Sequence, residues 1–300
     1  MWLILAFISA GLLGIYDIFK KQSLKDNAVI PVLFLSTVFS TLIFLPFIIL
    51  SATNVIPEGT MIYVPRETLD AHLFIILKAC IVSASWIFGY FALKNLPITI
   101  VGPINATRPV IVLLGALLIF GERLNLYQWI GVILAIIAVF LLSRGGKKEG
   151  IDFVHNKWIL FVVIAALLGA FSALYDKYIM NIRHFDTMFV QSWCNLYVML
   201  IMLVALLILW YPKRNAQPFH WTWAILFISI FLSIADFAYF TSLSQEGALI
   251  SIVSMVRRGN VIVSFLCGAL IFKEKNLKSK AAGLAVILVA LVFLYLGSRL

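Results

Sequence analysis

Three arginines lie deep inside apolar stretches of this sequence. Arg108 is near the centre of the apolar run 97–120, and Arg257 and Arg258 are near the centre of the run 247–272. A charged side chain at the centre of a bilayer costs at least about 2.5–3.5 kcal/mol, so it usually faces a water-filled cavity or a charged partner. Because guanidinium groups match the geometry of carboxylates and phosphates, these arginines are candidates for binding an anion.

The alternative interpretation is that the arginines only pair with acidic residues on neighbouring helices. Asp236, near the middle of the apolar run 221–244, is the deepest acidic candidate. One aspartate does not neutralise three arginines, and counting Asp17 and Lys78 as well leaves a surplus of two positive charges in the apolar runs. Lys78 is expected to extend toward an interface, which reduces the surplus without removing it. Substrate binding and helix pairing both remain open at this point.

Residues that weaken a helix directly follow two of the arginines. Pro109 follows Arg108, and Gly259 follows Arg258. Proline removes a backbone donor and frees a carbonyl group inside a helix. Many carriers build their binding sites from helices that are broken near the midplane of the membrane. We therefore favour Arg108 and Arg258 as substrate contacts, with a simple kink as the alternative reading of the proline.

Aromatic residues at a similar depth are candidates for the walls of a cavity. Trp86 and Tyr90 are four residues apart and would share one face of a helix. Tyr239 lies in the later run that also holds Asp236. For each ring, packing or lipid contact is the competing interpretation.

Four acidic residues complete the set of candidates. Asp236 and Asp17 are expected either to carry a coupling proton or to pair with a charge, as acidic residues inside transporters do. Glu122 and Glu274 stand at the ends of two apolar runs and are expected to cap loops or lock the fold.

The composition predicts an integral membrane protein. Hydrophobic residues make up 63% of the 300 residues, charged residues 12%, and the mean hydropathy is +1.06. Soluble domains carry roughly 45–50% apolar and about 25% charged residues. The net charge of +10 does not indicate a nucleic-acid partner, because the basic residues fall mostly between the apolar runs, where they would set membrane orientation.

Ten apolar runs are each close to the roughly 20 residues that a helix needs to span a bilayer. The expected spans are 2–19, 29–50, 71–94, 97–120, 125–143, 157–180, 186–211, 221–244, 247–272 and 280–298. A glycine-rich, charged segment near the midpoint of the chain is typical of a linker. We therefore expect two five-helix units, 1–143 and 157–300, joined by the linker 144–156.

The two units share short motifs in the same order. The sequence Ala-Gly-Leu-Leu-Gly at 10–14 recurs as Ala-Ala-Leu-Leu-Gly at 165–169, and Leu-Ile-Phe-Gly-Glu at 118–122 recurs as Leu-Ile-Phe-Lys-Glu at 270–274. Because each unit has an odd number of spans, the second unit must be inverted relative to the first. Inverted repeats are typical of secondary transporters, whose sites lie near the midplane between the repeats.

These features resemble the EamA-type drug/metabolite transporter superfamily. The resemblance rests on five helices per half, on the proline that precedes Glu122, and on the Leu-Ile-Phe-x-Glu ending of both fourth helices. It implies a ten-helix carrier that works by alternating access, with the first four helices of each half around a central cavity. Val261 stands where Pro109 would align, and the buried glutamate in the first helix of the small multidrug exporters has no counterpart, since that helix carries only Asp17 near its end. Proton-coupled export of lipophilic cations is therefore not the favoured activity.

The sequence thus predicts an all-α carrier in the cytoplasmic (inner) membrane for a small anionic or zwitterionic metabolite, such as an amino acid, an organic acid or a phosphorylated compound. The alternatives are a flippase for a lipid-linked anion and a drug or amino-acid exporter whose arginines are structural. An enzyme is not expected, since the sequence has no deep histidine, metal-ligand cluster or Walker motif, and neither a metal nor a cofactor is expected. The expected partners are the solute, membrane lipids and a coupling proton or exchanged solute, in a monomer or homodimer.

Overall fold

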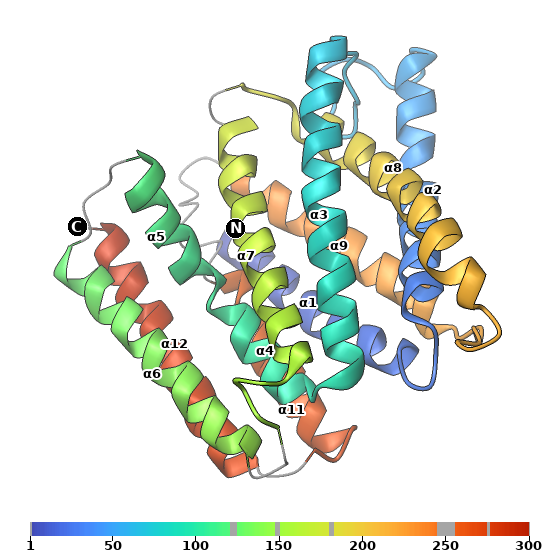
Figure 1. Ribbon diagram of the computed structural model, residues 1–300. Helices are drawn as coiled ribbons and strands as arrows, with labels where there is room; N and C mark the ends of the chain where they lie inside the picture. Colours follow the sequence, from blue (N-terminus) through green and yellow to red (C-terminus); the bar gives the residue numbers. More distant parts are fainter. Residues whose placement is uncertain are drawn as a thin grey trace.

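The computed structural model describes residues 2–120, 125–147, 151–179, 183–244, 256–274 and 277–299, and all regular structure in these ranges is helical (Figure 1). The first half contains α1 (Trp2–Ser23), α2 (Val29–Ala52), α3 (Leu69–Asn95), α4 (Ile98–Ala106), α5 (Arg108–Phe120) and α6 (Leu126–Lys147). The second half contains α7 (Lys157–Lys177), α8 (Thr187–Ala205), α9 (Ala224–Ser244), α11 (Asn260–Leu270) and α12 (Leu277–Arg299). A π-helical turn, Leu206–Trp210, and a short 3₁₀ turn, Tyr211–Lys213, continue α8.

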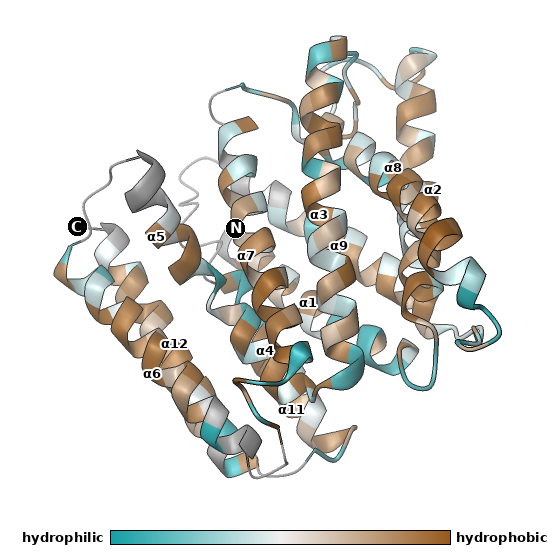
Figure 2. Cartoon of the chain, viewed as in Figure 1, coloured by the Kyte–Doolittle hydropathy of each residue, from teal (hydrophilic) through white to brown (hydrophobic). Residues whose placement is uncertain are grey.

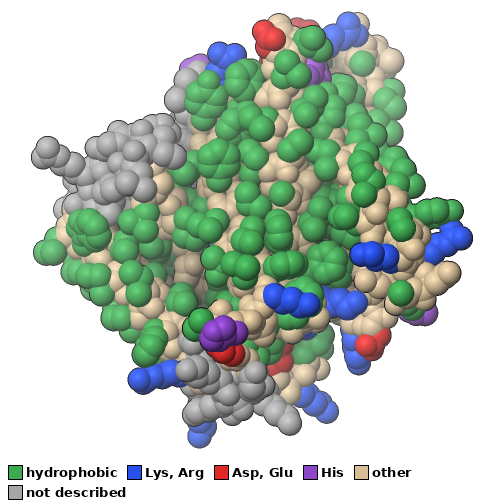
Figure 3. Space-filling view, viewed as in Figure 1, with side chains coloured by type: hydrophobic (Ala, Val, Ile, Leu, Met, Phe, Trp, Pro, Cys, Tyr) green, Lys and Arg blue, Asp and Glu red, His purple; other side chains and the backbone are tan. Residues whose placement is uncertain are grey.

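The long helices suit a bilayer. Within the described residues, five helical stretches are long and apolar enough to cross a membrane, and the longest of them are Leu69–Asn95 and Thr187–Lys213. Figure 2 shows apolar residues along the helix bodies and polar residues at their ends and in the loops. In Figure 3 hydrophobic side chains cover most of the visible face. A bilayer requires every backbone polar group to be satisfied within the protein, and helices satisfy their own. The helical fold and the apolar exterior therefore both suit a lipid environment.

Polar side chains fix where several helices begin. The Thr68 hydroxyl accepts a hydrogen bond from the backbone N–H of Ala71 at 3.4 Å, and the Asn156 amide oxygen accepts one from Trp158 at 2.8 Å. The Asp186 carboxylate accepts from Met188 at 2.7 Å. Such caps satisfy backbone donors that the first turn of a helix leaves unpaired.

Two of the expected spans are interrupted near their centres. The fourth span divides at Thr107, between α4 and α5, and Pro109 lies in the first turn after the break. Proline cannot donate to the carbonyl four residues earlier, which explains the position of the break. In the ninth span a turn at Arg258 and Gly259 precedes α11. Both deep arginine positions therefore stand at helix interruptions rather than inside continuous helices.

Most helix contacts occur twice, once for a pair of helices and again for the equivalent pair with the two halves interchanged. The contact of α1 with α9 matches that of α7 with α3, and the contact of α1 with α11 matches that of α7 with α5. The contact of α2 with α9 likewise matches that of α8 with α3, α4 contacts α11, and two further large contacts pair equivalent helices, α2 with α8 and α6 with α12. The last pair lies side by side at the edge of the bundle (Figure 1). The fold is therefore the expected two-repeat helical bundle.

Glu274 fixes one end of the bundle. Its carboxylate accepts hydrogen bonds from the backbone N–H groups of Ile98 at 2.7 Å and Thr99 at 3.1 Å, and from the Thr99 hydroxyl. A carboxylate at a helix N-terminus satisfies unpaired donors and meets the positive end of the helix dipole. The expectation that Glu274 locks the fold is confirmed, whereas Glu122 lies outside the described residues.

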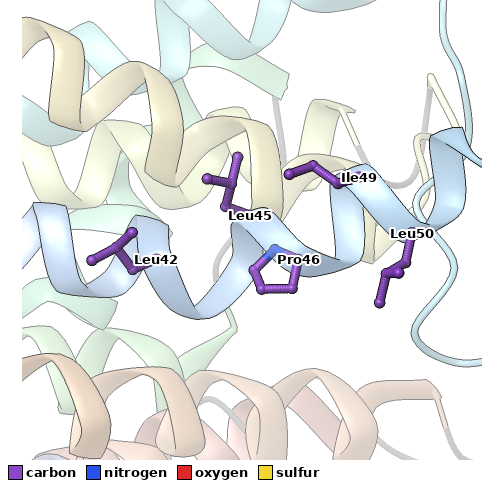
Figure 4. A pocket seen from close by; sticks show the side chains of 5 residues that line it. All are labelled: Leu42, Leu45, Pro46, Ile49 and Leu50. Atoms are coloured by element: carbon purple, nitrogen blue, oxygen red, sulfur yellow. The ribbon is translucent and has the colours of Figure 1, made fainter.

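An apolar groove of about 350 Å³ lies along α2 (Figure 4). Its lining residues are all apolar: Leu42, Leu45, Pro46, Ile49 and Leu50. Leu42 and Ile49 are each more than half exposed, so the groove opens on the outer surface of the bundle. Nothing in its lining could hold a charged solute, and the charged side chains considered next lie on other helices.

Candidate functional site

Arg108 connects the first half of the chain to the second. Its guanidinium lies against Gly169 of α7, where a Cβ atom would come within 2.7 Å of the Arg108 Cζ atom. The Arg108 Nη2 atom donates to the backbone carbonyl of Ala165 at 3.3 Å. Its Nε atom is buried and has no hydrogen-bond partner among the described residues. The glycine thus provides the space for the arginine, and the arginine keeps unused donor capacity.

Arg257 is the arginine that pairs with an acid. It forms an ion pair with Asp236 of α9, and its Cζ atom lies 4.1 Å from the ring centroid of Tyr239. The side chains of Arg257 and Asp236 are 20% and 28% exposed. A guanidinium stacked on a ring gains cation–π attraction in addition to the ion pair. For Arg257 the structure therefore supports the pairing interpretation.

Arg258 lies among charges of both signs without direct pairing. The arginines Arg108 and Arg257 and the acid Asp17 are all within electrostatic range of its guanidinium. In the described part of the chain no hydrogen bond or ion pair to Arg258 is present. Two like charges disfavour a third beside them. A bound anion would relieve this repulsion, so the arrangement suits an anion-binding position.

Asp17 is held by neutral donors. Its Oδ2 atom accepts hydrogen bonds from Asn260 Nδ2 at 3.0 Å and from Ser264 Oγ at 2.9 Å, which join α1 to α11. Neither Asn260 nor Ser264 was predicted from the sequence as a site residue. The available signal was their spacing of four residues on one helix face, directly after Gly259.

The predicted aromatic residues lie in different surroundings. Tyr90 is fully buried, and the ammonium of Lys20 lies 4.2 Å from its ring centroid and 5.2 Å from that of Tyr16. Trp86, one turn earlier on α3, is half-buried against the apolar core. Tyr239 lies beneath Arg257, as described above. The structure therefore joins Tyr239 directly to an arginine and Tyr90 to Lys20, and it places Trp86 in the core packing.

Lys78 pairs with an acidic residue, whereas the sequence led us to expect that it extends toward the membrane interface. Rather than extending alone toward an interface, it forms an ion pair with Asp176, which joins α3 to α7. The side chains of Lys78 and Asp176 are 12% and 38% exposed. Lys78 also lies within electrostatic range of Asp236. The Lys78–Asp176 and Arg257–Asp236 ion pairs thus neutralise four of the interior charges.

The charges of this interior group do not balance. Among the described residues it contains five basic side chains (Lys20, Lys78, Arg108, Arg257 and Arg258) and three acidic ones (Asp17, Asp176 and Asp236). Two positive charges are therefore in excess in this group, which adds Lys20 and Asp176 to the residues counted from the sequence. Buried polar atoms are also left without partners within the described ranges, including the Asn105 amide oxygen, which belongs to the last turn before the break at Thr107.

The same ranges offer no sign of a metal centre. No group of three or more His, Cys, Asp or Glu side chains within the described residues could hold a metal ion. Cys80, Cys194 and Cys267 are free thiols on separate helices. The chemistry that this part of the structure offers is binding by charge and hydrogen bonds.

Comparison with known proteins places this arrangement in a family. The model of the EamA-like transporter family matches residues 1–144 and 156–296. An uncharacterized transporter from Archaeoglobus fulgidus is 26% identical over 155 residues, which cover 51% of this chain and 50% of that protein. The uncharacterized transporter YxxF from Bacillus subtilis is 25% identical over 126 residues, covering 42% of this chain and 38% of its own. The chain thus matches half or less of the length of these curated relatives.

A solved crystal structure supports the fold over a longer stretch. It superposes with a TM-score of 0.59, covers 97% of this chain and 98% of its own, and is 17% identical in sequence. At this level of identity the likeness concerns the fold alone.

Proposed function

The chain belongs to the EamA-like transporter family, and we propose that it is a secondary active transporter for a small anionic or zwitterionic metabolite. Amino acids, organic acids and phosphorylated compounds are the solutes that fit this description. The proposed binding position lies at the two helix breaks, beside Arg108 and Arg258, which are within electrostatic range of each other. The proposed location is the cytoplasmic (inner) membrane, in agreement with the apolar exterior of the helices.

One observation carries the proposal. Arg108 and Arg258 come from different halves, stand at helix interruptions and lie within electrostatic range of each other, and neither forms an ion pair with an acid in the described part of the chain. Unpaired charges inside a bilayer are expensive, and they typically mark substrate or ion pathways. An exporter with purely structural arginines would be expected to pair them as it pairs Arg257.

Alternating access follows from the same architecture. The helix contacts are preserved on exchange of the halves, and rocking of one inverted repeat against the other would open the site to each side in turn. Arg108 contacts α7 across the boundary between the halves. Asp17 is the better candidate for proton coupling, because its bonds come from neutral donors, whereas Asp236 is an ion-pair partner.

A ligand screen with matched variants tests the proposal. The purified full-length chain in detergent would be heated with carboxylates, amino acids, phosphates, sugar nucleotides and lipophilic cations, since a ligand that binds the folded state raises its apparent stability. We expect anions or zwitterions to stabilise it. Arg108→Gln and Arg258→Gln should each weaken that binding at least about tenfold, because hydrogen bonds to charged groups contribute about 1.5–3 kcal/mol.

Arg214→Gln is the matched control, because Arg214 is exposed in the turn after α8 and stacks on Tyr211. It should bind as the wild type does. Stabilisation by cations or neutral compounds only, or unchanged anion binding in both deep variants, would contradict the proposal and leave the arginines structural.

A further inference from the structure

We infer that the solute held between the two helix breaks carries two negative charges, as a dicarboxylate or a phosphate monoester does. This inference rests on the proposed function and makes its solute class narrower. The supporting observation is that some of the interior cations form ion pairs with acidic residues and others do not.

Two of the interior cations are already neutralised. Lys78 forms an ion pair with Asp176, and Arg257 forms one with Asp236. These pairs join α3 to α7 and α9 to the turn before α11. Removing either acid would leave a buried cation uncompensated. Neither pair therefore offers a free charge to a solute.

The remaining group is unbalanced by two. Lys20, Arg108 and Arg258 share the single acid Asp17 within the described residues. In its ionised state Asp17 compensates one cation without forming a closed ion pair, since its hydrogen bonds come from neutral donors, and the charge balance applies to that state. A solute with one negative charge would leave one cation uncompensated in a low-dielectric interior, and a solute with three would reverse the imbalance. A dianion brings the occupied site to neutrality, which is the least costly state to carry across a bilayer.

The two negative charges of such a solute would be shared between two guanidinium groups, one in each half of the chain. Arg108 begins α5 in the first half, and its buried Nε atom lacks a partner in the described part of the chain. Arg258 lies in the turn that precedes α11 in the second half. With a dicarboxylate, each guanidinium could form paired hydrogen bonds with one carboxylate. With a phosphate monoester, both guanidinium groups could donate hydrogen bonds to the same phosphate. A dianion would thus connect the two halves of the carrier as well as neutralise the site.

The test compares solutes that differ mainly in charge. Wild-type protein would be titrated at pH 7.5 with butyrate, succinate and tricarballylate, and separately with glycerol 3-phosphate and its methyl diester. At this pH the monoester is doubly charged, since its second pKa is about 6. We expect succinate or glycerol 3-phosphate to bind at least about tenfold more tightly than the singly charged compound of its series, the effect of losing one hydrogen-bonded charge. The two series distinguish a dicarboxylate from a phosphate monoester.

Variants then change the surplus by a known amount. Arg108→Gln and Arg258→Gln reduce it to one and should move the preference to the singly charged compounds. The double variant Arg257→Gln with Asp236→Asn leaves the surplus unchanged and should keep the preference for dianions. Size-exclusion profiles identify any variant that fails to fold, and the wild-type series remains decisive in that case.

The outcomes separate the two proposals. Wild-type protein that prefers singly or triply charged anions would overturn this inference and leave the anion carrier standing. Preference for dianions that survives both single-arginine variants would also overturn it. Protein that no anion stabilises would overturn the proposed function, and this inference with it.

Discussion

Two helix contacts are equivalent under the internal repeat: α1 with α11, and α7 with α5. The repeated motifs align Gly14 with Gly169 and Asn260 with Arg108. At the first contact a Cβ on Gly14 would lie 2.6 Å from Val263 Cγ1 and 3.2 Å from the backbone oxygen of Asn260. At the second, a Cβ on Gly169 would meet the Arg108 guanidinium. In both halves a glycine permits the close approach of the broken helix.

The polar groups at these two contacts differ. The first contact holds an acid, Asp17, between Asn260 and Ser264. The second holds a base, Arg108, and the residue that aligns with Asp17 is the buried Ser172. The backbone packing is thus repeated while the charge is not. This difference teaches that the repeat determines the fold, and that the departures from the repeat determine the chemistry of the site.

The largest expected effect comes from removing the acid of the first contact. Asp17→Ala deletes two hydrogen bonds to a charged group and leaves three cations without an acid, so it should reduce the free energy of unfolding by about 3 kcal/mol. Ser172→Ala should cost less than about 1 kcal/mol. Thermal unfolding of both variants in detergent measures this, and equal losses would show that the two contacts are energetically alike.

The two glycines should differ as well, by a smaller amount. Gly14→Ala forces Cβ against Val263 and backbone, so we expect a loss of about 2 kcal/mol, within the range for overpacked cores. Gly169→Ala meets the end of a flexible side chain, so its main effect should be weaker anion binding as Arg108 is displaced. Melting curves with and without a stabilising anion measure both effects. A stable Gly14→Ala protein or normal anion binding by Gly169→Ala would break the comparison.

Removing one donor to Asp17 should have the smallest effect. Ser264→Ala leaves the bond from Asn260 in place, so we expect a loss of about 1.5 kcal/mol from one hydrogen bond to a charged group. Ser264→Thr, which keeps the hydroxyl, is the matched control and should recover part of this loss. If both variants melt like the wild type, the serine hydroxyl does not stabilise the contact.

Local sequence signals predicted much of the helical architecture. The apolar runs predicted the spans because only helices of sufficient length satisfy the backbone in a bilayer. Most boundaries agree within a few residues, although α1 continues to Ser23 beyond the expected end at 19, and α9 begins at Ala224 rather than 221. At Pro109 the sequence left a break and a simple kink both open, and the structure shows a break at Thr107, whereas Pro46 and Pro103 lie inside α2 and α4 without interrupting them.

Partner choice could not be predicted in the same way. Arg257 and Arg258 are adjacent in sequence, yet only Arg257 forms an ion pair with Asp236 in the described structure. Lys78 and Asp176 are far apart in the chain and meet because α3 packs on α7. Tyr90 was a candidate for the wall of a cavity, and the sequence could not show that the ammonium of Lys20 lies over its ring.

By itself the sequence determined that this chain is a helical membrane protein with two related halves and with more basic than acidic side chains inside its apolar runs. These properties depend on composition, on local backbone chemistry and on a count, none of which changes with the packing. Only the tertiary structure decided which cations are neutralised, because an ion pair requires two side chains to face each other across helices. The arrangement of the helices leaves Arg108 and Arg258, at the two helix breaks, without an ion-pair partner in the described interior and within electrostatic range of each other.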